Sequence, residues 1–267
     1  MRITLLANRD LPANHVADAL LRALPEHDFS LVLSSRVGRP GPRAPALREL
    51  AVAEQRLPYE LLDRLLASPT EGRMRSWREL GDLVDGGLQD LDRPRTAAGR
   101  ALLAGLEPDL ILSVRYGGIL DAGHVDLARH GILNLHSGRL PEYRGVLATF
   151  RAMLAGDTRL ACTLHRIVDD GIDTGPLVAR GEIDAAPERS VFWNVMRLYE
   201  PGIELLVDAV RHIAAGDALP GQEQDREAGA YFGVPDADEL TKAAARGVRL
   251  VSLEDAFEIY RELLGPR

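Results

Sequence analysis

The feature that most constrains the fold is an alternation of short apolar runs with stretches of helical periodicity. Strand-like runs cover residues 2–7, 29–34, 110–114 and 132–135, and helical patterns cover 13–24, 96–104 and 122–130. Parallel strands need a crossover between them, and a helix of ten to fifteen residues commonly supplies it. The pattern therefore predicts an α/β fold, Rossmann-like, with a mainly parallel sheet and helices on both faces.

The rest of the chain extends this plan and adds a smaller C-terminal part. Helices are expected at 46–54, 59–66, around 76–82, at 147–155 and at 253–264, strands at 159–168 and 176–183, and a loop at 36–43. A long helix at 190–215 contains Pro201-Gly202, which bends it or splits it in two. We expect a catalytic domain over 1–200 and an appendage over 201–267 that packs on it or forms homodimer contacts.

Composition and charge exclude several classes of protein. The apolar runs are far shorter than the roughly 20 residues that cross a bilayer, and the N-terminus lacks a signal pattern, so a cytoplasmic protein without membrane contact is expected. A formal net charge of -8 disfavours a nucleic-acid partner. A single cysteine, Cys162, and scattered histidines predict neither a disulfide nor a metal site.

Polar residues cluster where strands of such a sheet end. Ligands of open α/β sheets bind beyond the carboxyl ends of the strands, which here are residues 8–10, 115–120 and 136–145. Asn134 and His136 are two apart at a strand end, so both side chains point to the same side and can face one oxygen atom. An isolated pair of this kind also fits a strand end whose polar groups simply bond the following turn.

The loop 169–175 places three carboxylates among two glycines between two apolar strands. Its plain interpretation is an acidic hairpin connection. A carboxylate next to an imidazole would instead favour the protonated ring, which is the better electrophile toward a developing oxyanion. His165, with Leu164 and Ile167 beside it, is interpreted as a structural core or edge histidine.

Two segments together carry a resemblance to a known family. Asn134-Leu-His-Ser-Gly-Arg-Leu-Pro-Glu-Tyr-Arg-Gly145 and Thr163-Leu-His-Arg-Ile-Val-Asp-Asp-Gly-Ile-Asp-Thr-Gly-Pro-Leu177 resemble, in order and spacing, the signature of folate-dependent formyltransferases. The resemblance covers about residues 96–200. It implies that Asn134 and His136 hold the oxygen of a tetrahedral intermediate and that Asp173 orients His136 and helps to move protons through water.

The same resemblance implies a binding site for the formyl donor, 10-formyltetrahydrofolate, and no metal. Pro108-Asp-Leu-Ile-Leu112 and the residues after it are similar to the pterin-recognition segment. The implied donor-site residues are Tyr116, Gly117, Gly118, Ile119, Leu120, Val168, Asp169, Asp170, Gly171 and Ile172. The acceptor is expected to approach Asn8, Arg9, Asp10, Arg139 and Arg144, although Arg139 also fits a solvated loop arginine.

The acceptor itself stays open at this level. The turn Ala7-Asn-Arg-Asp-Leu-Pro12 lacks the glycine-rich phosphate loop of the purine-pathway members, and the acidic residues 201–267 are too few for the basic C-terminal domain of the tRNA-acting members. The expected acceptor is a small-molecule amine, in an amino-sugar nucleotide or a specialised metabolite. The alternatives are a 10-formyltetrahydrofolate hydrolase and a non-catalytic folate-binding protein.

Overall fold

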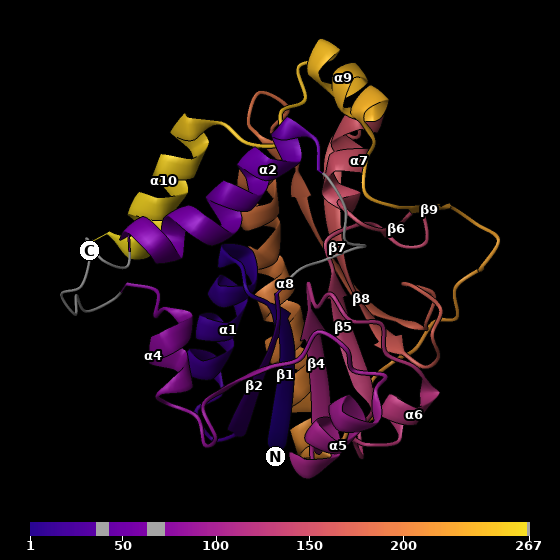
Figure 1. Cartoon of the computed structure of the whole chain (residues 1–267). Helices are drawn as coiled ribbons and strands as arrows, with labels where there is room; N and C mark the ends of the chain where they lie inside the picture. Colours follow the sequence, from indigo (N-terminus) through magenta and orange to yellow (C-terminus); the bar gives the residue numbers. More distant parts are fainter. Residues whose placement is uncertain (36–42, 63–72, 266–267) are drawn as a thin grey trace.

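A computed structural model describes residues 1–35, 43–62 and 73–265. Within these residues seven strands form one sheet, in the order β3-β2-β1-β4-β5-β7-β8 (Figure 1). The strands are β1 (Arg2–Asn8), β2 (Asp28–Ser34), β3 (Leu88–Asp90), β4 (Leu110–Val114), β5 (Ile132–His136), β7 (Arg159–Ile167) and β8 (Leu177–Asp184). Strands β1 to β5 are parallel, and β7 alone runs in the opposite direction, pairing antiparallel with both β5 and β8, which confirms the predicted mainly parallel α/β sheet.

Helices cover both faces of this sheet. The helical segments are α1 (Leu11–Ala23), α2 (Pro45–Ala51), η1 (Val52–Leu62), α4 (Trp77–Gly81), α5 (Ala97–Gly105), α6 (Ala122–Val125), α7 (Ala148–Ala155), α8 (Val191–Ala215), α9 (Ala237–Ala245) and α10 (Leu253–Leu264). One face packs against α1 and α8 through the larger apolar core, which includes Leu133 and Leu135 of β5. The opposite face has a smaller core in which Ile132 meets Leu103 of α5. Alternate residues of β5 therefore point to different layers.

Several predicted helices differ in extent from the observed ones. The helix expected at 122–130 is the single turn α6, after which Leu127 and Ala128 donate to carbonyls only three residues back. The helices expected at 46–54 and 59–66 are instead α2 running directly into the π-helix η1, where Pro58 lacks the N–H of a regular helix. Residues 63–66, and residues 36–42 of the predicted loop, lie outside the described residues.

Helix α8 crosses the predicted domain boundary without a break. It contains Pro201 and continues to Ala215, so the Pro201-Gly202 pair does not split it. Beyond it, α10 packs against α8, and Ile259 and Tyr260 belong to the larger core. A second, two-stranded sheet joins β6 (Tyr143–Gly145) to β9 (Ala230–Phe232), which ties the C-terminal segment to the loop after β5 (Figure 1). No helix among the described residues is long and apolar enough to span a bilayer.

Gly202 sets how closely α8 approaches the sheet. A Cβ added at this glycine would lie 2.8 Å from Leu135 Cδ2 and 3.4 Å from Cys162 Sγ. We expect Gly202→Val to lower the free energy of unfolding by about 1–3 kcal/mol because the extra methyl groups overpack the core. The measurement is urea unfolding of both proteins. Gly105→Val is the control, since a Cβ there meets nothing within 4 Å, and equal effects at the two sites would contradict the close-packing argument.

Candidate active site

The site is built on the carboxyl end of β5. Asn134 and His136 pair with His165 and Thr163 of the antiparallel strand β7. Directly opposed residues project to the same side of a sheet, so all four side chains lie on the face away from α8. The structure therefore brings His165 beside Asn134, a neighbour that the sequence interpretation assigned to the core.

Asp173 joins the two strands from the loop between β7 and β8. Its carboxylate lies 3.4 Å from His136 Nδ1 and 3.4 Å from His165 Nε2, and it accepts a 2.8 Å hydrogen bond from the Gly145 N–H. Asp173 has a φ of +55°, in the left-handed region that non-glycine residues rarely adopt. The Gln224 side chain holds this turn by donating to the Asp173 and Gly175 carbonyls, at 3.1 and 2.6 Å. The three predicted catalytic side chains are therefore in one cluster.

The charge of Asp173 is stabilised inside this cluster. Burial acts to raise its pKa, but the imidazoles of His136 and His165 and the Gly145 N–H outweigh burial and hold the pKa well below its usual range. On the other side, His136 Nε2 lies 2.7 Å from the Tyr143 carbonyl oxygen, which can only accept. Both ring nitrogens of His136 thus face oxygen acceptors within the chain.

His165 orients the amide of Asn134. Its Nδ1 lies 3.0 Å from the Arg166 carbonyl and therefore donates, and its Nε2 lies 3.0 Å from Asn134 Nδ2 and 3.4 Å from an Asp173 carboxylate oxygen. Sequence reasoning missed this contact because it depends on the register between β5 and β7; the period-two spacing of Thr163 and His165 was the available signal.

Arg95 bridges the two predicted donor-site segments: its Nη2 donates to the Leu120 carbonyl at 3.4 Å and lies 3.2 Å from the Asp170 carboxylate. Ile119 on one segment and Val168 and Ile172 on the other are 48%, 39% and 37% exposed. Asp169, by contrast, is used locally, in an ion pair with Arg226 at 2.7 Å and in the turn at Gly171.

The residues predicted on the acceptor side all have partners within the chain. Asn8 and Asp10 are 2% and 0% exposed. Arg9 pairs with Asp90 at 2.5 Å, Arg139 pairs with Glu182 at 2.8 Å, and Arg144 donates to the Arg226 carbonyl at 2.9 Å. Contact of these five residues with an acceptor stays a prediction.

Behind this end of the sheet lies a buried ion-pair cluster that the sequence did not indicate. Arg115 donates to Asp10 and to Glu54, each at 2.8 Å, and Asp10 also accepts from the Ala13 N–H as the N-cap of α1. Burial raises the pKa of Glu54 to about 7, because the opposing charges of Arg115 and Arg43 offset only part of the desolvation cost and Asp10 adds repulsion.

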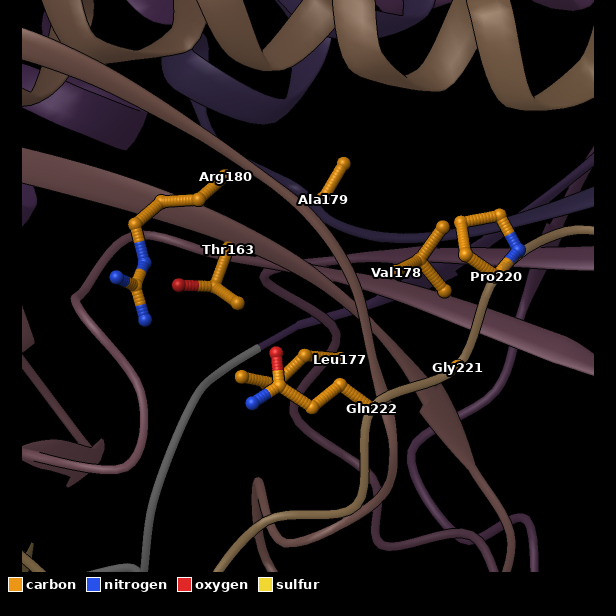
Figure 2. Close-up of a pocket in the computed structure, with 8 residues that line it drawn as sticks. All are labelled: Thr163, Leu177, Val178, Ala179, Arg180, Pro220, Gly221 and Gln222. Carbon is orange, nitrogen blue, oxygen red and sulfur yellow. The ribbon is translucent and has the colours of Figure 1, made fainter.

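A cavity of about 360 Å³ lies along β8, the strand that β7 separates from β5 (Figure 2). It is lined by Thr163, Leu177, Val178, Ala179, Arg180, Pro220, Gly221 and Gln222. Thr163 connects it to the loop after His136, because its hydroxyl donates to the Gly138 carbonyl and accepts from the Leu140 N–H. Arg180 donates to the Leu140 carbonyl from the cavity side. Across the described ranges, no group of three or more His, Cys, Asp or Glu side chains is arranged to hold a metal ion.

The raised pKa of Glu54 gives a stability prediction with a definite sign. Between its ordinary pKa of 4.5 and about 7 the native chain keeps a proton that the unfolded chain has lost, so rising pH lowers the free energy of unfolding in this window. We expect the stability of the wild type relative to Glu54→Gln to fall between about pH 5 and about pH 8. Urea unfolding across this range measures it.

The control for this pH series is Glu258→Gln. The hydrogen bond from Arg189 holds the pKa of Glu258 below its usual range, so this carboxylate already has its charge across the whole window. The stability difference between wild type and Glu258→Gln should stay level from about pH 5 upward. A level difference for Glu54→Gln as well would contradict the assignment of a protonated carboxyl at Glu54.

Comparison with known proteins finds relatives of this chain. Residues 91–210 match the formyl transferase family. The chain is 34% identical over 146 residues to the methionyl-tRNA formyltransferase of Aromatoleum aromaticum, covering 54% of this chain and 46% of the relative. It is 32% identical over 229 residues to that of Bordetella pertussis, covering 85% of this chain and 64% of the relative. The chain spans about half the length of the curated relatives it matches.

Solved structures share the fold at low sequence identity. A 4-N formyltransferase from Francisella tularensis aligns with a TM-score of 0.57 at 13% identity, over 98% of this chain and 87% of that one. Phosphoribosylglycinamide formyltransferase from Anaplasma phagocytophilum aligns with a TM-score of 0.56 at 18% identity, over 88% of this chain and 99% of that one. The sequence match over residues 91–210, together with the shared fold, places this part of the chain in the formyl transferase family.

Proposed function

We propose that this protein transfers the formyl group of 10-formyltetrahydrofolate to the amine of a small molecule. The observation that carries the proposal is the cluster of Asn134, His136 and Asp173 at the end of β5. The proposed donor site is the pair of segments 116–120 and 168–172, which carry the exposed apolar side chains of Ile119, Val168 and Ile172 toward which a flat pterin ring would pack.

The geometry suits the addition step of this transfer. The amine nitrogen attacks the formyl carbon and the carbonyl oxygen becomes an oxyanion, to which the Asn134 amide can donate and to which His136 Nε2 can donate in place of the Tyr143 carbonyl. The bond between the formyl carbon and N10 of the folate then breaks, and one proton moves from the amine to N10. Because its pKa is held low, Asp173 is a poor proton acceptor, and its part is to orient His136 while water relays the proton.

Two classes of acceptor are to be distinguished. The curated relatives are methionyl-tRNA formyltransferases, which makes a tRNA acceptor the second candidate. The formal net charge of -8 opposes binding to a phosphate backbone, so a small-molecule amine is the first candidate. A tRNA acceptor would show a KM that rises steeply with salt concentration, whereas an uncharged or singly charged amine would show little change.

We expect Asn134→Ala to reduce kcat by about 10²–10³, the usual cost of removing one donor to an oxyanion, and His136→Ala to reduce it at least as much. The assay follows tetrahydrofolate release and the mass of the formylated product. Its panel contains amino-sugar nucleotides, N-hydroxylated diamines, free amino acids and methionyl-tRNA.

The matched control is His212→Ala, which removes an exposed histidine on the far part of α8 whose ring bonds only the Asp208 carbonyl among the described residues. It should retain wild-type turnover. Formate release without any amine would support the hydrolase alternative, and folate binding without turnover would support the non-catalytic one. Undiminished turnover in Asn134→Ala would disprove the assigned role of that amide.

A further inference from the structure

A continuous series of buried hydrogen bonds connects Arg115 to Gly117, the residues on either side of Tyr116. We call its five side chains, Glu54, Arg115, Asp10, Asn8 and Ser34, the buried polar chain. The links are Arg115 to Glu54 (2.8 Å), Arg115 to Asp10 (2.8 Å), Asn8 to Asp10 (2.6 Å), Ser34 to Asn8 (3.3 Å) and the Gly117 N–H to Ser34 (2.9 Å). The series therefore begins on η1, passes through the ends of β1 and β2, and returns to the segment after β4.

The two ends of this series hold the backbone at the start of segment 116–120. Arg115 has a φ of +56°, which a residue with a side chain keeps only where its surroundings enforce it. Its guanidinium is fixed by two carboxylates, and two residues later the Gly117 N–H is fixed by the Ser34 hydroxyl. Between them, the Tyr116 hydroxyl donates to the Leu91 carbonyl at 2.6 Å. The turn into segment 116–120 is thus held at three successive residues.

The position of these groups separates them from direct contact with a ligand. Asn8, Asp10 and Ser34 are 2%, 0% and 1% exposed. Buried charges and amides are costly unless all are satisfied, and a satisfied network makes its surroundings rigid. Glu54 extends the network to the C-terminal part of the chain, because the Tyr260 hydroxyl of α10 donates to the carbonyl of the adjacent Ala53 at 2.6 Å.

We propose that the buried polar chain is a positioning device for the formyl-donor site, in which Ser34 and Glu54 act through Gly117 and Arg115 to fix the backbone of segment 116–120. The inference rests on the proposed function for its link to the folate. The sequence led us to expect that Asn8 and Asp10 contact the acceptor. The present proposal instead gives these two residues a role on the donor side.

The first test is independent of activity. Hydrogen exchange is followed in the unliganded protein, in peptides that cover 115–121. Ser34→Ala removes the acceptor of the Gly117 N–H, and at about pH 8, where the Glu54 carboxyl has lost its proton, Glu54→Gln weakens the hold on Arg115. Losing one such hydrogen bond is worth about 1 kcal/mol, so exchange in this segment should rise by about fivefold or more. Peptides from α8 should not change, and Ser34→Thr, which keeps the hydroxyl, should restore the slow exchange.

The second test uses the folate. In Ser34→Ala, the dissociation constant for tetrahydrofolate and the KM for the formyl donor should both rise by about fivefold. The acceptor KM and the kcat at saturating donor should remain within about twofold, because the acceptor side and Asn134 and His136 are not part of the chain of contacts. Glu258→Gln, which removes an ion-pair partner of Arg189 away from these segments, controls for general loss of stability.

The outcomes separate this inference from the proposed function. Unchanged exchange in 115–121 for Ser34→Ala overturns the positioning role, whatever the activity. Equal losses in donor and acceptor KM also overturn it, because they indicate a general structural effect. If the wild type binds no folate, the proposed function fails, while the exchange measurement still decides whether the buried polar chain fixes the segment.

Discussion

The site depends on one buried carboxylate. Asp173 lies where three parts of the chain meet: β5 through His136, β7 through His165, and the loop after β5 through the Gly145 N–H. A buried charge without partners would cost several kcal/mol. The loop containing Asp173 therefore takes up a left-handed φ that lets the carboxylate reach all three partners, and the backbone strain is offset by these contacts. Asp173 thus holds the three parts of the site together and also supplies its buried negative charge.

The sequence predicted the part of this site that follows from local periodicity. Asn134 and His136 share a side because they are two residues apart on a strand, and their place at a sheet edge follows from the α/β alternation. Asp173 could be assigned to the same cluster only through the resemblance to a family, since no local sequence pattern determines the distance between the loop after β7 and β5. His165 was interpreted as a structural core or edge histidine for the same reason.

The parts of the fold that the sequence did not predict are those in which distant residues decide the outcome. Helical periodicity over 122–130 was real, but the chain turns after α6 and enters β5 through Gly131, whose φ of +73° favours glycine. At Pro201-Gly202 the sequence indicated a bend or break in the helix, but α8 continues without a break. The small Gly202 lets α8 pack closely on Leu135. Arg115 and Glu54 are 61 residues apart in sequence, and no local pattern indicates their pairing.

Contacts within the chain also limit which side chains are available to recognise an acceptor. Asn8 and Asp10 are committed to the interior, and Arg139 is held by Glu182, so an acceptor that used these groups would first have to break buried or paired contacts. The Arg180 guanidinium makes a single hydrogen bond to the described residues, at 2.6 Å to the Leu140 carbonyl, and borders the cavity along β8. The turn into segment 116–120 is held by contacts within the chain, whereas the β8 side has a cation beside a cavity. Under the proposed function, this difference would suit one constant donor and an acceptor that is selected on a separate surface.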